Sequence, residues 1–82
     1  MTEYEIVSEK LALASAALNR AAELIDAAGM ATRNTRALDY GSQWIANAYR
    51  FRADAALVYG DSLRVRDLER DQLAAAAETD QP

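Results

Sequence analysis

Cysteine and histidine are both absent from the 82-residue sequence. Without cysteine the chain can form no disulfide and has no thiol nucleophile. Without histidine it lacks the side chain that most often acts as a general base or binds a transition metal. No serine has a candidate general base near it in the sequence. No two carboxylates form a pair suited to general acid–base catalysis. The sequence therefore predicts a protein that is not an enzyme, with no catalytic residue, no metal and no cofactor.

Helix-breaking residues and aromatic side chains are scarce. Proline occurs once and glycine three times, and aromatic residues make up 7% of the chain. Much of the 51% hydrophobic content is alanine, which is the best helix former and buries little area per residue. We therefore expect an all-α fold with a thin core. A single domain of this size is close to the lower limit of independent stability, and association with a second copy often stabilises such chains.

Long hydrophobic runs are also missing. The longest uncharged apolar-rich run covers residues 11–18, which is far too short to span a membrane. The first five residues carry two glutamates and no basic side chain, whereas a secretory leader begins with basic residues. The net charge of -4 argues against general affinity for nucleic acid or for anionic lipid. We therefore expect a cytoplasmic protein that does not bind membranes.

Capping signals and apolar periodicity predict an antiparallel helical hairpin. Thr2 and Glu5 have the spacing of a capping box, and Gly29 is suited to the position that ends a helix, which predicts a helix over residues 3–28. A second helix is expected over about 34–59. Gly60 and Ser62 then offer a break and a new cap, which predicts a third helical segment over about 62–77. Whether Gly60 breaks the second helix is left open. Residues 1–77 form a single domain in this interpretation, and 78–82 form a disordered tail.

Each long helix has an apolar stripe with the alternating three- and four-residue spacing of a coiled coil. Folding the chain about residue 31 places Leu18 against Trp44 and Ala21 against Gly41. The stripe of the first helix is Tyr4, Val7, Leu11, Ala14, Leu18, Ala21, Ile25 and Ala28, and that of the second is Ala37, Gly41, Trp44, Ala48, Phe51, Ala55 and Val58.

Further apolar residues remain outside these two stripes. We expect one leftover set to be covered by residues 62–77 and the other by a second copy or by a different protein. This predicts a dimeric helical bundle, with a homodimer as the most common arrangement for such chains. The candidate interaction surface comprises Ile6, Leu13 and Leu24 on the first helix and Leu38, Ile45, Tyr49 and Tyr59 on the second.

Arginines are concentrated in the middle of the chain. Arg33, Arg36, Arg50 and Arg52 are candidate charged contacts for acidic residues of the first helix or of a partner. Residues 49–52 alternate aromatic and basic side chains, as nucleic-acid surfaces do. The positions of Tyr49 and Phe51 on apolar stripes favour an ordinary helix surface over a nucleic-acid site.

The residues predict a helical protein–protein interaction module that acts by binding another protein. The alternatives are a purely structural bundle that assembles only with itself and a weak nucleic-acid binder that uses the arginines of 33–66. The excess of arginine over lysine and the alanine-rich composition are typical of GC-rich genomes, which suggests an accessory or host-modulating factor of a phage or an actinobacterium. Length and alanine content resemble those of the small helical hairpins of the WXG type. Residues 29–32 lack their Trp-x-Gly turn, however, and Trp44 lies inside a predicted helix, so no family is assigned.

Overall fold

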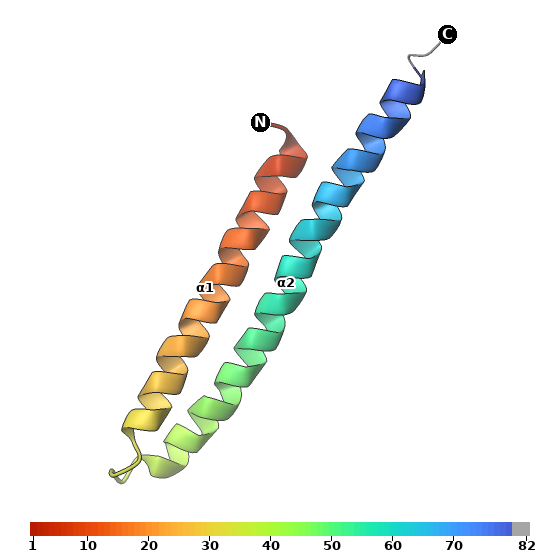
Figure 1. The fold of residues 1–82 in the computed structure, drawn as a ribbon. Coiled ribbons are helices and arrows are strands. Elements are labelled where there is room, and N and C mark those ends of the chain that lie inside the picture. Colours follow the sequence, from red (N-terminus) through yellow and green to blue (C-terminus); the bar gives the residue numbers. More distant parts are fainter. Residues whose placement is uncertain (80–82) are drawn as a thin grey trace.

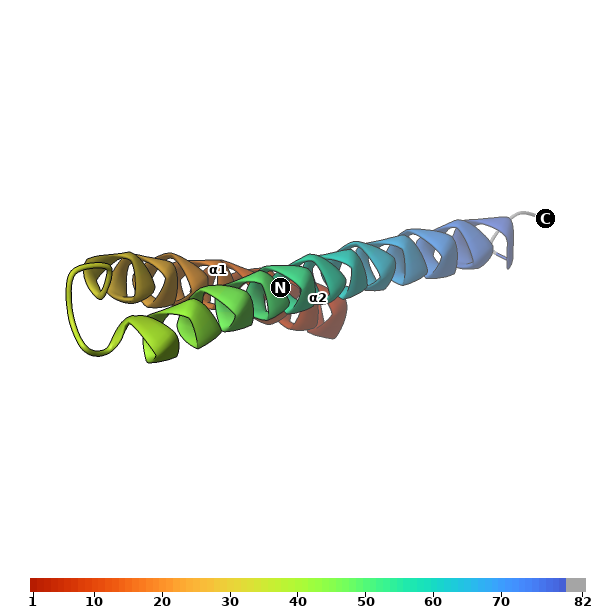
Figure 2. The ribbon, with the colours of Figure 1, turned by 90° about the horizontal axis from the view of Figure 1, so that it is seen from below.

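The computed structural model describes residues 1–79 and consists of two antiparallel helices joined by a short loop (Figure 1). Helix α1 spans Glu3–Ala31 and helix α2 spans Leu38–Thr79. The two helices lie side by side in Figure 1, and in the view from below they cross each other at a shallow angle (Figure 2). The molecule is a rod that measures 74 × 18 × 10 Å between Cα atoms. The predicted all-α hairpin is confirmed, and no strand occurs within residues 1–79.

Helix α1 begins as predicted and ends later than predicted. The Thr2 hydroxyl accepts a hydrogen bond from the backbone N–H of Glu5 at 3.1 Å, which satisfies a free donor of the first turn. Gly29 does not end the helix. Its φ is negative, and the helix continues to Ala31. Thr32 is the C-cap, and its hydroxyl donates to the Gly29 carbonyl oxygen at 2.7 Å.

Helix α2 is continuous through Gly60, so the prediction of a separate third helix is wrong. Residues 62–77 are helical, but they are the second half of α2. Glycine inside a helix costs about 1 kcal/mol relative to alanine, which is less than the loss of the hydrogen bonds that a break at this position would cause. The end of α2 projects beyond the first turn of α1 (Figure 1). Of the predicted disordered tail, residues 78 and 79 belong to α2 and residues 80–82 lie outside the described part of the chain.

The line of contact between the helices is made almost entirely of small residues spaced seven apart. The buried residues of α1 are Ser8, Ser15, Ala22 and Gly29, and those of α2 on the same line are Gly41, Ala48, Ala55 and Ser62. A repeat of seven keeps one face of each helix against the other when the helices supercoil. Because these side chains are small, the two backbones approach each other closely.

Hydrogen bonds and close contacts fix the register of this line. Ser62 Oγ donates to the Ser8 carbonyl oxygen at 2.9 Å, and Ser15 Oγ donates to the Ala55 carbonyl oxygen at 2.8 Å. Gly41 faces Gly29, eight residues along α1 from its predicted partner Ala21. The predicted register is therefore wrong, because α1 ends later and α2 begins later than the sequence pattern indicated.

Candidate functional site

The predicted stripe of the first helix is real, but it covers one side of the hairpin instead of the line between the helices. In both helices, the residues one position before and three positions after a buried small residue project to the same side of the hairpin. They form a surface that we call the apolar face. On α1 its members are Tyr4, Val7, Leu11, Ala14, Leu18, Ala21, Ile25 and Ala28. On α2 its members are Trp44, Phe51, Val58, Val65 and Leu68, together with Tyr40, Asn47, Asp54 and Asp61 directly before the buried residues.

The apolar face is only partly shielded by the hairpin itself. Leu18, Phe51 and Val58 are half-buried along the groove between the helices. Trp44 is 38% exposed and Leu68 is 59% exposed. The apolar residues that are fully buried within residues 1–79 are three alanines. Most of the large apolar side chains of this chain therefore keep contact with water.

Two hollows in the apolar face lie between the helices. The one near the loop is lined by Ile25, Ala28, Trp44, Asn47 and Phe51. The one near the N-terminus is lined by Glu3, Tyr4, Val7, Val65 and Leu68. Each hollow takes residues from both helices, which confirms that the two stripes face the same side. Their linings are mainly apolar, so they suit apolar side chains of a partner.

The charges of this face lie at its edges and on α2. The eight α1 residues that belong to the face, from Tyr4 to Ala28, are all uncharged at neutral pH. On α2, Asp54 and Asp61 lie along the outer edge of the face, and both are exposed.

The opposite side of the hairpin, which we call the charged face, carries acids on α1 and arginines on α2. Arg52 Nη2 lies 3.3 Å from Asp26 Oδ2, and the Arg52 guanidinium lies 5.7 Å from the centre of the Tyr49 ring. The arginine and aspartate side chains of this pair are 38% and 37% exposed. Water screens an ion pair at this depth, so its contribution to stability is at most about 1 kcal/mol.

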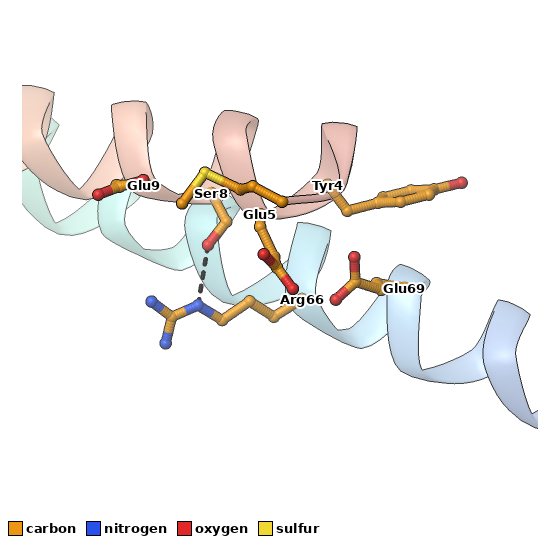
Figure 3. Close-up of a pocket in the computed structure, with 7 residues that line it drawn as sticks. Tyr4, Glu5, Ser8, Glu9, Arg66 and Glu69 are labelled. Carbon is orange, nitrogen blue, oxygen red and sulfur yellow. Dashed lines mark hydrogen bonds between the residues drawn. The ribbon is translucent and has the colours of Figure 1, made fainter.

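A third hollow lies on the charged face beside the N-terminus of α1 (Figure 3). Arg66 Nε donates to Ser8 Oγ at 2.8 Å, and the carboxylates of Glu5, Glu9 and Glu69 line the same space. An arginine cannot take up a proton from Ser8, so this contact does not activate the hydroxyl as a nucleophile. The carboxylates disfavour an anionic ligand, and no metal-binding group of three acidic side chains occurs in residues 1–79.

The predicted interaction residues do not form one surface. Ile6, Leu13 and Leu24 are exposed along the outer side of α1, away from α2. On α2, Leu38, Tyr49 and Tyr59 are exposed on the charged face. Ile45 is only half-buried, and its side chain lies beside Gly29.

The predicted charged contacts are dispersed as well. Arg33 donates to Met30 Sδ at 3.2 Å beside the loop, and Arg36 is exposed within the loop. Arg50 is exposed on the outer side of α2, and Arg52 pairs with Asp26. Tyr49 and Phe51 lie on opposite faces of the hairpin. Residues 49–52 therefore present no joint platform of aromatic and basic side chains.

Within the described residues, neither helix contains a stretch that is long and apolar enough to cross a membrane. Comparison of the chain with family models, with curated proteins and with solved structures finds no match.

Proposed function

We propose that this chain is a non-enzymatic protein–protein interaction module that binds helical surfaces through its apolar face. The observation that carries the proposal is the apolar face itself, an uncharged α1 stripe from Tyr4 to Ala28 set beside Trp44, Phe51, Val58 and Val65 of α2. A monomeric protein rarely exposes a continuous apolar surface of this length.

The energetics favour a partner. Removal of apolar surface from water contributes about 25 cal/mol per Å². Within residues 1–79, the hairpin alone fully buries only Ala22, Ala48 and Ala55 among its apolar residues. A partner that covers Leu18, Phe51 and their neighbours adds the large side chains to a core that otherwise consists of small ones.

The shape of the face favours a helix as the binding element. Ala14, Ala21 and Ala28 recur every seven residues beside the larger Leu18 and Ile25. This alternation of small and large residues creates the holes into which the side chains of a facing helix insert. The hollow beside Ala28 and Trp44 is one of these holes.

The composition suggests a biological context for this proposal. Arginine far exceeds lysine and alanine dominates the apolar content. Such a composition is typical of GC-rich genomes, and we propose that the module is a small accessory or host-modulating factor of a phage or an actinobacterium.

The test compares two alanine-to-glutamate variants on the same helix. Ala14 and Ala16 are both exposed in α1, but only Ala14 belongs to the apolar face. The wild-type chain and each variant are immobilised and offered cell lysate together with soluble wild-type chain. The proposal predicts that immobilised wild-type and Ala16→Glu retain the same protein, either one from the lysate or the soluble chain. Immobilised Ala14→Glu should not retain it. Equal retention by the two variants would contradict it.

A further inference from the structure

We propose that a second copy of the chain covers the apolar face, with the two-fold axis parallel to the helices. In this arrangement α1 of each copy packs on α2 of the other. The four helices form a closed bundle with both loops at the same end. This inference rests on the proposed function, because it assigns an occupant to the same face.

The size of the face matches the needs of a stable dimer. The α1 stripe runs from Tyr4 to Ala28, which corresponds to about 36 Å at 1.5 Å per residue. The hairpin is 18 Å wide between Cα atoms. The plan area is therefore about 650 Å² per copy, or about 1,300 Å² for two copies, and a stable interface needs about 1,000 Å² or more.

If all four helices are aligned, a two-fold axis can pack the apolar faces of two copies together in two ways. A two-fold axis parallel to the helices places α1 on α2 of the second copy. A two-fold axis across the helices places α1 on α1 and α2 on α2. The parallel axis permits no sliding along the rod, because a closed two-fold pair has no translation along its axis. It therefore fixes which residues of the two copies lie at the same level.

Charges on the edges of the face distinguish the two arrangements. Ser8 lies beside Ser62, and the helices are antiparallel. Two residues further along α1, Lys10 therefore lies at the same height along the rod as Gly60, and Asp61 is one residue away from this height. Lys10 is on the outer edge of α1, and Asp61 is on the outer edge of α2. With the parallel axis, the two edges meet and Lys10 of each copy lies close to Asp61 of the other. This pairing is favourable.

The crosswise arrangement brings like charges together. The centre of the apolar face lies near Leu18 and Ala14, at the level of Ala55 and Asp54 on α2. A two-fold axis across the helices at this level places Asp54 of one copy beside Asp54 of the other. Two carboxylates at an interface repel each other, and this cost disfavours the arrangement.

Cross-linking of single-cysteine variants separates these arrangements, because the natural chain contains no cysteine. Lys10→Cys, Asp61→Cys, Asp54→Cys and Gln43→Cys are prepared separately, mixed in pairs, unfolded, refolded together and treated with a short bis-maleimide. Gln43 lies near the loop end of α2, far from the level of Lys10, so the pair of Gln43→Cys with Lys10→Cys is the matched control.

The proposal predicts that the mixture of Lys10→Cys and Asp61→Cys gives a covalent dimer at a yield about tenfold above that of either variant alone or of the control pair. Efficient cross-linking of Asp54→Cys with itself would overturn the parallel arrangement in favour of the crosswise one. A chain that stays at 9.0 kDa at every concentration would exclude the second copy. The capture of another protein by Ala16→Glu but not by Ala14→Glu would still support the proposed function.

Discussion

Gly29 of α1 packs directly against Gly41 of α2. A Cβ atom on Gly29 would lie 2.7 Å from the Gly41 carbonyl oxygen, and a Cβ atom on Gly41 would lie 2.8 Å from the Gly29 carbonyl oxygen. Each glycine therefore gives space to the backbone of the other helix. Neither has a positive φ, so the requirement for glycine here comes from the close approach of the helices and not from the local backbone conformation.

The first prediction follows from this contact. Gly29→Ala and Gly41→Ala should each lower the free energy of unfolding by about 1–3 kcal/mol, because the added methyl group forces the helices apart near the loop. Urea unfolding followed by circular dichroism measures the change. Unfolding curves that match wild-type would show that the helices do not approach each other here as the structure describes.

Gly60 provides the matched control. No atom lies within 4 Å of the position that its Cβ would occupy, and it sits inside α2. Gly60→Ala should therefore raise the free energy of unfolding by up to about 1 kcal/mol, because alanine is the better helix former. The same urea experiment applies. A loss of stability would mean that Gly60 is needed for a bend or for a contact outside this hairpin.

A second prediction concerns the size of the side chains on the contact line. Ser15 is 5% exposed, and its hydroxyl donates to the Ala55 carbonyl oxygen. Ser15→Ala should cost about 1 kcal/mol or less, because it removes one hydrogen bond and keeps the volume small. Ser15→Leu should cost about 1–3 kcal/mol through overpacking. Thermal unfolding of both variants at one concentration checks the order, and a more stable leucine variant would contradict the small-residue contact line.

A third prediction concerns the ion pair on the charged face. Asp26→Asn and Arg52→Gln should each lower stability by less than about 1 kcal/mol, because both partners are more than one-third exposed. A double-mutant cycle in urea, at low salt and again at high salt, isolates the coupling between them. The coupling should shrink as salt increases. A large coupling that does not depend on salt would show that the pair is buried in the working form of the protein.

The hairpin, its first cap and the buried stripe of α2 could all be predicted from the sequence. Thr2 carries a recognisable cap signal, and Gly41, Ala48 and Ala55 lie on a regular stripe that the structure places on the contact line. These features depend on local propensity and on periodicity within one helix, both of which a single sequence contains.

The register and the face of α1 could not be predicted in the same way. The predicted contact stripe of α1 followed the larger residues Leu11, Leu18 and Ile25. The residues that lie on the contact line are instead Ser8, Ser15, Ala22 and Gly29. Serine in a core is unusual and becomes favourable here because its hydroxyl bonds to a carbonyl oxygen across the helices. The available signal was the seven-residue recurrence of small residues in both helices.

Local sequence signals also could not predict where α1 ends or that α2 is continuous. Gly29 and Gly60 both match a helix-ending signal in the sequence, but α1 and α2 run through them. Packing against Gly41 explains the first case. At Gly60, the helix continues because the helical hydrogen bonds on both sides of it are kept.

The single tryptophan offers a fourth prediction. Trp44 belongs to the apolar face and is 38% exposed in one copy of the chain. If a second copy or another helix covers this face, quenching of Trp44 fluorescence by acrylamide should weaken as the complex forms. A dilution series of the chain alone, with Ala14→Glu as the reference that stays dissociated, measures this. Quenching that is equally strong at all concentrations and in both proteins would show that the chain alone does not cover its apolar face.

The most direct test of the central claim is the solution mass of the chain by light scattering across a range of concentrations. The apolar face predicts that wild-type and Ala16→Glu reach twice the 9.0 kDa mass of one chain and that Ala14→Glu remains at the mass of one chain. A mass that Ala14→Glu and Ala16→Glu alter to the same extent would contradict the assignment of the interaction to the apolar face.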